Sequence, residues 1–196
     1  MKSHYRVVVI GGGVVGTSVL YHLAKMGWSD VCLIERSVLT AGSSWHAAGG
    51  IHALNADPNI AQLQAYTIDL LSEIEKESGQ NIGLHMTGGL TMAGTPDRWE
   101  WLQSAYRTFQ SIGIEDCRLA SVDEAVELNP IMSGEGLLGG MWADREGYVD
   151  TTGVVHAYAG AAKKNGAEII EHNRVLEMHQ TLEGWEVVTE KGSISC

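Results

Sequence analysis

Short apolar runs and glycine-rich turns alternate at the start of the chain. Residues 7–10 (VVVI) and 31–34 (VCLI) are continuously apolar and rich in β-branched side chains. Such runs are typical of strands that are buried on both faces of a parallel sheet. A glycine-rich turn at 11–16 separates the first run from apolar positions that predict a helix to about Met26, which Gly27 is placed to end. The pattern predicts one β–α–β unit.

Helix-start signals punctuate the rest of the chain. Asp57-Pro58 and Thr95-Pro96 each place a capping side chain before a proline, and apolar residues follow both at helical spacing. We expect the first of these helices to end before Gly79. The other expected elements are an extended segment at 84–93, a short helix that starts at Ser121 and stops before Asn129, a helix at 154–164, and strands at 168–178 and 185–189.

The order of these elements predicts an α/β fold that is interrupted by a different region. The first and last fifty residues are typical of sheet and helix layers in a nucleotide-binding domain. We therefore expect a Rossmann-like domain whose first segment is 1–80 and whose second, incomplete segment is 151–196. An inserted α+β region at 81–150 would contribute to substrate binding.

Composition narrows the class of protein. The 196 residues are 44% apolar and 19% charged, a globular balance, with 13 basic and 24 acidic residues and a net charge of −11. A strongly acidic chain argues against general nucleic-acid binding and against binding to an anionic membrane. No apolar run approaches the ~18 residues of a membrane-spanning helix. Three cysteines without CxxC spacing indicate neither a disulfide framework nor a metal site, and we expect a cytoplasmic protein with Cys32 buried.

The glycine turn matches the G-x-G-x-x-G pattern of dinucleotide-binding sites. Gly11 allows a tight turn, Gly13 allows backbone to approach a pyrophosphate, and Gly16 allows helix and strand to pack closely. Glu35 follows the second strand, where an acid accepts hydrogen bonds from a ribose, although Arg36 beside it weakens the preference for an unphosphorylated ribose. An ordinary glycine turn is the alternative, but strand, turn, helix, strand and acid together favour a dinucleotide site.

The segment 39–50 (LTAGSSWHAAGG) distinguishes this chain from a simple NAD domain, which passes quickly to its next helix after the acid. Small residues allow backbone to lie against a flat or anionic ligand, and serine hydroxyls can bind phosphate. A flexible glycine and serine loop is the other interpretation. Trp45 and His46 in the centre of the segment argue against it.

These segments together resemble a known family. The GGGVVG turn, the pair Glu35-Arg36 and the stretch TAGSSWHAAGG resemble amine-oxidising flavoproteins of the D-amino-acid-oxidase superfamily, in particular the dimethylglycine and sarcosine dehydrogenases. The segments HMTGG at 85–89 and GYVD at 147–150 support the resemblance. It implies a glutathione-reductase-type FAD-binding fold. It also implies an enzyme that oxidises the CH–NH group of a secondary or tertiary amine, such as dimethylglycine or sarcosine, with oxidative demethylation and hydride transfer to flavin N5.

The resemblance also implies roles for individual residues. His46 would carry FAD through a covalent 8α-histidyl bond, and a neutral imidazole is a competent nucleophile for that bond. Val14 and Val15 would border the pyrophosphate, Glu35 and Arg36 the adenosine, 42–50 the flavin, and Val175 the adenine through its backbone. No catalytic residue and no metal ligand is predicted. The predicted cofactor-binding residues are Gly11, Gly13, Val14, Val15, Gly16, Glu35, Arg36, Gly42, Ser43, Ser44, Trp45, His46, Ala47, Ala48, Gly49, Gly50 and Val175.

Several alternatives stay open. Gly50 stands where members of the family usually have leucine, which leaves the loop geometry at the flavin undetermined. We expect residues 1–196 to be the N-terminal portion of a larger protein or a truncated reading frame. Tetrahydrofolate would bind only if an aminomethyltransferase-like half follows, and the electron acceptor is a flavoprotein or oxygen. Another amino-acid or amine oxidase of the superfamily, or a non-catalytic fragment, are the rival functions. Trp99, Trp101 and Tyr106 could form a cage for an alkylated amine, but their helical spacing favours a core stripe.

Overall fold

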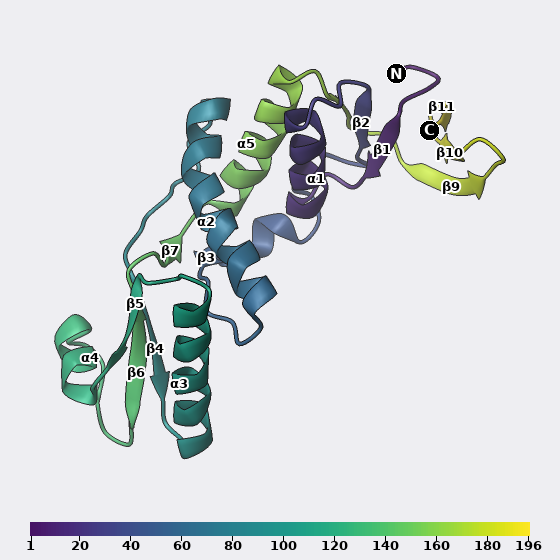
Figure 1. The fold of residues 1–196 in the computed structure, drawn as a ribbon. Helices are drawn as coiled ribbons and strands as arrows, with labels where there is room; N and C mark the ends of the chain where they lie inside the picture. Colours follow the sequence, from purple (N-terminus) through teal and green to yellow (C-terminus); the bar gives the residue numbers. More distant parts are fainter. The chain divides into compact units, whose positions relative to one another are not determined.

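A computed structural model describes residues 1–196 and divides them into two units (Figure 1). Both units are discontinuous in sequence, because the chain leaves the first unit and returns to it twice. The first unit consists of Met1–Gly49, Glu73–Gly83 and Asp150–Cys196, and the second of Gly50–Ser72 and Leu84–Val149.

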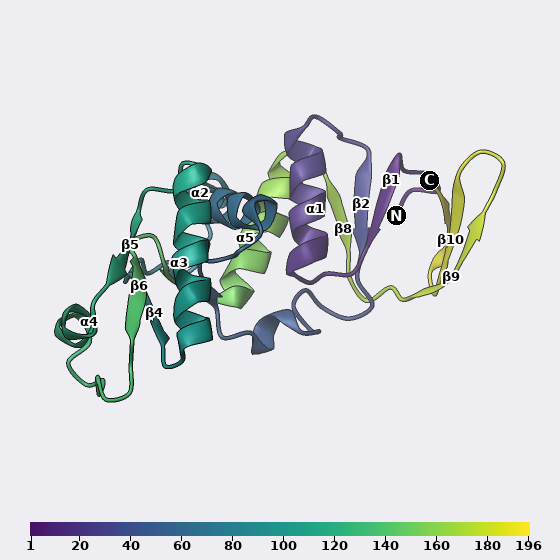
Figure 2. The same ribbon diagram turned by 60° about the horizontal axis from the view of Figure 1, so that its bottom comes forward.

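Three layers build the first unit. A parallel sheet lies in the middle, two helices cover one face, and an antiparallel sheet covers the other (Figure 2). The parallel sheet has the order β1-β2-β8 and the antiparallel sheet the order β11-β10-β9. The elements are β1 (Val7–Ile10), β2 (Val31–Ile34) and β8 (Glu168–Ile170) in the middle, α1 (Val14–Lys25) and α5 (Thr151–Lys164) on one face, and β9 (Val175–Gln180), β10 (Trp185–Thr189) and β11 (Gly192–Ser195) on the other.

The central strand β2 is buried along its whole length, as its continuous apolar run predicts. Tyr5, Cys32, Ile34, Val187 and Ile194 form the core between the two sheets. The prediction that Cys32 is buried is confirmed, and burial raises the pKa of its thiol to about 12. At neutral pH this thiol is therefore protonated and serves as a small apolar side chain.

The second unit is a small antiparallel sheet with helices packed on it. Its sheet has the order β4-β6-β5, and α3 contacts all three strands. Buried residues from the sheet, from α3 and from the segment 53–68 form one core. The elements are β3 (Gly50–Ile51), which pairs with β7 (Gly147–Tyr148), β4 (Gly89–Ala93), β5 (Cys117–Ala120), β6 (Gly139–Ala143), α3 (Pro96–Ser111), α4 (Val122–Leu128), and the first part of α2 (Pro58–Ser78).

The boundary of the inserted region differs from the expected division at 80. Residues 50–72 belong to the second unit, because Ala53, Ala61 and Ile68 lie in its core. The end of α2 belongs to the first unit, where Tyr21 Oη donates to a carboxylate oxygen of Glu77 at 2.8 Å. Apolar spacing along α2 reports that one face is buried, but it does not report which neighbour buries it.

The predicted helix starts are confirmed by their caps. Thr95 Oγ1 accepts from Arg98 N, and Ser121 Oγ accepts from Glu124 N, each at 3.2 Å. The late helix begins at residue 151 and not at 154, because the carboxylate of Asp150 accepts from the first-turn N–H groups at 3.0 Å.

The expected strand at 168–178 is wrong in one respect, because two strands of different sheets occupy it. The parallel strand β8 stops at Ile170, and the antiparallel strand β9 starts at Val175. Between them His172 adopts a left-handed φ of 52°, and Asn173 is fully buried. The turn therefore moves the chain from one sheet to the other.

The core interpretation of the aromatic residues in α3 is favoured over a ligand cage. Trp99, Trp101 and Tyr106 are partly buried and pack against the core of the second unit. None of the helices combines the length and the apolar composition that crossing a bilayer requires.

Glu146 is a partly buried acid in the turn between β6 and β7. Its side chain lies directly over Gly89, where a Cβ atom would overlap it. Burial raises the pKa of Glu146 to about 7, and the negative charge of Asp116 contributes in the same direction. The neighbouring cation does not neutralise it, because Arg145 forms ion pairs with Asp69 and Asp116.

The raised pKa predicts how stability depends on pH. Because the folded-state pKa of Glu146 exceeds the ordinary value of a glutamate, its protonated form favours the folded state, and this contribution is lost as pH rises from about 4.5 through 7. Glu146→Gln keeps a neutral side chain at every pH. We expect its thermal midpoint, relative to the unmodified protein, to rise progressively between pH 5 and pH 7.5 and then to level off.

Glu115→Gln is the control, since it removes the same charge from an exposed neighbouring position. Thermal unfolding of both variants across this pH range checks the prediction. Equal pH profiles for the two variants would contradict it.

Candidate functional site

The glycine-rich turn connects β1 to α1 in a conformation that needs glycine. Gly11 has a φ of +108°, and a Cβ atom on Gly16 would overlap the carbonyl oxygen of Gly11. The missing side chains let α1 begin directly behind the turn, at Val14. Its N-cap residue is Gly13, which has no side chain to cap the helix. The start of α1 therefore presents backbone N–H groups and the positive end of its dipole, which suits a pyrophosphate.

Glu35, at the carboxyl end of β2, fastens the glycine turn to the next loop. One carboxylate oxygen accepts from Gly12 N at 2.7 Å, and the other accepts from Ser37 N at 2.8 Å. A carboxylate has about four acceptor positions, so each oxygen keeps one for a ligand hydroxyl. The geometry allows Glu35 to orient the turn and to accept from a ribose at the same time.

A cavity of about 340 Å³ lies at the carboxyl ends of β1 and β2. It brings together four of the predicted cofactor-binding residues, namely Gly11 of the glycine turn and the three residues expected at the adenosine, Glu35, Arg36 and Val175. Sequence analysis did not assign the other four lining residues. The complete lining is Ile10, Gly11, Ile34, Glu35, Arg36, Asn173, Arg174 and Val175.

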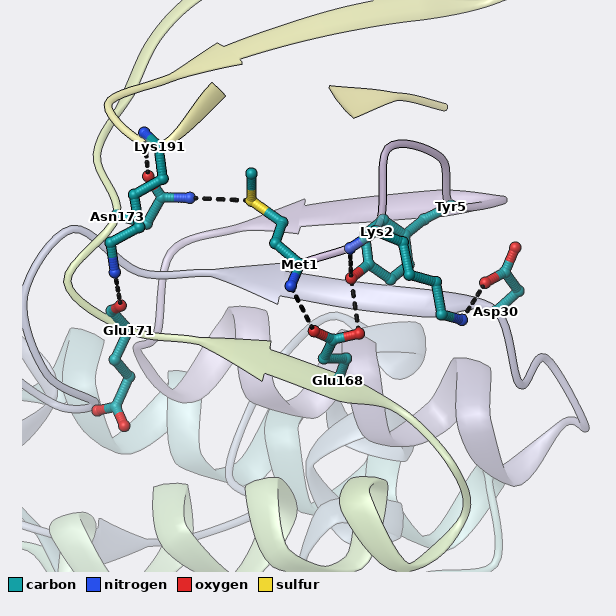
Figure 3. Close-up of polar contacts among 8 residues, drawn as sticks. All are labelled: Met1, Lys2, Tyr5, Asp30, Glu168, Glu171, Asn173 and Lys191. Atoms are coloured by element: carbon teal, nitrogen blue, oxygen red, sulfur yellow. Dashed lines mark hydrogen bonds and ion pairs between the residues drawn. The ribbon is translucent and has the colours of Figure 1, made fainter. Parts of the chain in front are cut away.

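Asn173 holds the far wall of this cavity in place and was missed by sequence analysis (Figure 3). Its side chain is 0% exposed, its backbone N donates to the Glu35 carbonyl at 3.0 Å, and its Oδ1 accepts from Lys191 N at 3.2 Å. Its Nδ2 contacts the sulfur of Met1 at 3.4 Å. Asn173 lies inside the segment 168–178, which the sequence predicts as one continuous strand, so the pattern contains no signal for this role or for the partners of the side chain.

Further polar contacts tie the chain start and the loops around this wall together. Figure 3 shows Glu168 in contact with the Met1 ammonium, at 3.8 Å, and with the Tyr5 hydroxyl, at 2.6 Å. Burial, and then the bond to Glu168, raise the pKa of Tyr5. Lys191 Nζ donates to the carbonyl of Glu171 at 3.3 Å, and the carboxylate of Glu171 accepts from Leu39 N at 2.7 Å. The side chain of Glu171 thus joins the loop after β8 to the backbone of the loop after β2.

The loop after β2 returns to the glycine turn. Thr40, with a left-handed φ of 71°, donates its N–H to the carbonyl of Gly12 at 3.0 Å. Ser44 Oγ accepts from Val14 N at 2.9 Å, and a Cβ atom on Gly13 would lie 3.1 Å from that oxygen. The hydroxyl of Ser44 keeps its own proton for a phosphate oxygen. The loop and the helix start therefore lie against each other, and their hydrogen-bond donors form an arrangement that would suit an anion.

His46 lies at the end of the short 3₁₀ turn η1 (Ser44–His46) and is exposed. Its Nδ1 lies 3.1 Å from the carbonyl oxygen of Gly42. A carbonyl oxygen only accepts, so Nδ1 carries the proton and Nε2 keeps its lone pair in the neutral ring. The Trp45 indole lies against the imidazole, with ring centroids 3.8 Å apart.

The remaining predicted residues follow this turn in the chain. Gly42, Ser43, Ala47 and Ala48 are exposed loop residues of the first unit, and Gly49 is buried with a φ of 78°. Gly50 belongs to the second unit, where it pairs with Tyr148 in the small β3–β7 ladder. Contact of these residues with a flavin stays a prediction.

The residues present fit a bound dinucleotide. The glycine cradle would be filled by any side chain at Gly16, the start of α1 offers N–H donors, and an acid borders a cavity at the ends of two parallel strands. This arrangement is a crevice outside the carboxyl ends of a parallel sheet, which is where open α/β sheets bind ligands.

Comparison with known proteins extends the resemblance that the motifs indicate. The family described as FAD dependent oxidoreductase (DAO) matches residues 6–196. Dimethylglycine dehydrogenase of Rattus norvegicus is 33% identical over 98% of this chain and 22% of its own length. Sarcosine dehydrogenase of Homo sapiens is 35% identical over 88% of this chain and 19% of its own length. The pyruvate dehydrogenase phosphatase regulatory subunit of Mus musculus is 34% identical over 100% of this chain and 22% of its own length.

Solved structures share the fold. L-proline dehydrogenase from P. horikoshii superposes with a TM-score of 0.90 at 24% identity, over 100% of this chain and 51% of the other. Glycine oxidase from Geobacillus kaustophilus gives a TM-score of 0.83 at 26% identity, over 54% of its chain. These likenesses confirm the predicted Rossmann-like FAD-binding fold. The chain spans about a fifth of the length of the dimethylglycine and sarcosine dehydrogenases and of the regulatory subunit named above. Because the family model matches almost the entire chain, the chain belongs to the FAD dependent oxidoreductases of the DAO family.

Proposed function

We propose that this chain is the FAD-binding part of an oxidoreductase that acts on the CH–NH group of a secondary or tertiary amine, such as dimethylglycine or sarcosine. The observation that carries the proposal is the contact of the loop 39–46 with the glycine turn, because it adds a nucleophilic histidine to an ordinary dinucleotide site. The similarity to dimethylglycine and sarcosine dehydrogenases supports the choice of amine.

In this proposal the chain binds and orients the cofactor. The N–H groups at the start of α1 and the Ser44 hydroxyl would bind the pyrophosphate. Glu35 would accept from the ribose, while Arg36 and the backbone of Val175 border the adenine. His46 would anchor the flavin through Nε2. FAD, when bound, supplies the acceptor at N5 for a hydride from the carbon beside the amine nitrogen.

The wider activity belongs to the proposal as well. Oxidative demethylation would leave an iminium that releases formaldehyde to water, or that passes its one-carbon unit to tetrahydrofolate if the protein also has an aminomethyltransferase-like half. The electron acceptor would be a flavoprotein or oxygen. The expected cytoplasmic location stays a prediction, and the mammalian relatives are named as mitochondrial.

A second function is favoured by one comparison. The phosphatase regulatory subunit of Mus musculus matches this chain as well as the dehydrogenases do, and its name describes regulation and not oxidation. A protein of that type would share the fold without amine turnover. An oxidase of the same superfamily that uses oxygen is the nearer enzymatic alternative, and glycine oxidase from Geobacillus kaustophilus has the same fold.

Gly16→Ala tests whether the glycine cradle binds FAD. The added methyl group would overlap the carbonyl oxygen of Gly11, so the free protein relaxes by moving the turn. Restoring the original turn around bound FAD would then cost what overpacking costs, about 1–3 kcal/mol, or roughly 5- to 150-fold in affinity. We expect a loss of that size in FAD affinity, measured by quenching of flavin fluorescence on binding to the apoprotein. Gly160→Ala is the control, because its new methyl group would meet only Ser78 Cβ at 3.8 Å. Unchanged affinity in Gly16→Ala would argue against this binding mode.

His46→Ala tests the covalent anchor. Acid-denatured full-length protein is expected to carry the mass of one FAD, and this mass should be absent from the variant. His156→Ala removes another exposed histidine of the first unit and should keep the flavin. Flavin released by acid from the unmodified protein would leave the FAD site intact but remove His46 as anchor. No flavin in either fraction would favour the regulatory alternative. Turnover of dimethylglycine or sarcosine would distinguish the proposed amine-oxidising enzyme from the regulatory protein and from an oxidase of another substrate.

A further inference from the structure

Trp45 is a large exposed aromatic residue in the loop that follows β2. Its side chain is 56% exposed, so burial in the protein core does not explain its position. The ring instead lies against the imidazole of His46, with centroids 3.8 Å apart and an angle of 33° between the planes. Contact between two aromatic faces at this distance is attractive and restricts the rotation of both rings.

A second contact fixes the same imidazole from its edge. The carbonyl oxygen of Gly42 accepts from Nδ1 at 3.1 Å. The bond selects the tautomer in which Nε2 is unprotonated, and it prevents a ring flip that would exchange the two nitrogens. The turn itself is closed by backbone bonds from His46 N to Ser43 O, at 3.2 Å, and from Ala47 N to Ser44 O, at 3.3 Å.

We infer that Trp45 is a positioning residue for covalent attachment of the flavin at His46, because its indole face and the Gly42 carbonyl together hold the imidazole in one orientation with Nε2 free. The inference rests on the proposed attachment. A nucleophile on an exposed three-residue turn would otherwise sample several rotamers, and only a near-attack geometry is productive. Trp45 acts through His46 and does not need to touch the reacting carbon.

The bond-forming step balances without a further protein group. His46 Nε2 would bond to the 8α carbon of a bound flavin as that methyl group loses one proton and the imidazole loses the proton of Nδ1. The electron pair of the broken C–H bond and two protons would pass to the flavin ring, and dioxygen would accept both electrons and both protons as hydrogen peroxide. The Gly42 carbonyl, as the acceptor on Nδ1, stabilises the positive charge that develops on the imidazole while the bond forms.

The test separates attachment from binding. Full-length apoprotein, produced under riboflavin limitation, is mixed with FAD. Non-covalent affinity is measured from flavin fluorescence on ice, and covalent incorporation is followed by intact mass after acid quenching. For Trp45→Leu we expect incorporation at saturating FAD to slow roughly 10- to 100-fold, a larger factor than any loss of FAD affinity in the same variant. Trp45→Phe retains an aromatic face and should restore most of the rate.

Trp185→Leu is the matched control, because it removes an indole that is 47% exposed from β10 of the same unit. It should leave both quantities unchanged. An unchanged incorporation rate in Trp45→Leu, or equal losses of affinity and rate, would overturn the positioning role while the covalent anchor stands. Absence of covalent flavin in the unmodified protein, or covalent flavin retained in His46→Ala, would overturn both this inference and the anchor at His46.

Discussion

The candidate site depends on the close approach of Gly16 to the carbonyl oxygen of Gly11. No side chain fits between them, so α1 begins immediately behind β1 and its first turn lies at the carboxyl end of the parallel sheet. The neighbouring Gly12 then has both backbone groups engaged from other loops, its N–H by Glu35 and its carbonyl by Thr40. A larger residue at 16 would move the turn and would lose these contacts together.

Carboxylates that accept from backbone N–H groups then fix the loops around the turn. Glu35 and Glu171 accept from three such groups, on Gly12, Ser37 and Leu39. Hydrogen bonds to a charged group contribute about 1.5–3 kcal/mol each, which is enough to hold loops that have little apolar surface to bury. A site that is ordered before the ligand arrives loses less conformational entropy on binding. The carboxylates of Glu35 and Glu171 therefore hold the backbone of the loops in place near this site.

Local sequence predicts most helices and strands of the first unit, but not the contacts between segments that are distant in the chain. The strands around Val7 and Val31 and the capped helices are predictable, because a buried apolar run and a capping side chain act within a few residues. The break at His172, the role of Asn173 and the transfer of residues 50–72 to the second unit depend on contacts from distant segments. No periodicity encodes such partners. For the site, the glycine pattern predicted Gly11 and Glu35, and the family resemblance added Arg36 and Val175. These four residues line one cavity, but neither source indicated the buried amide of Asn173 that supports it.

The turn η1 places two candidate ligand-binding side chains, Ser44 and His46, in the loop that follows β2. Ser44 faces the helix start through its bond to Val14 N, and His46 follows two residues later in the same turn. A 3₁₀ turn rises about 2 Å per residue, so the two side chains are held roughly 4 Å apart along its axis. In the proposed site, a cofactor whose phosphate is bound by Ser44 would therefore meet His46 at a constrained distance. Trp45 lies between the two residues in the chain and contacts the imidazole, so it would restrict the segment that sets this distance.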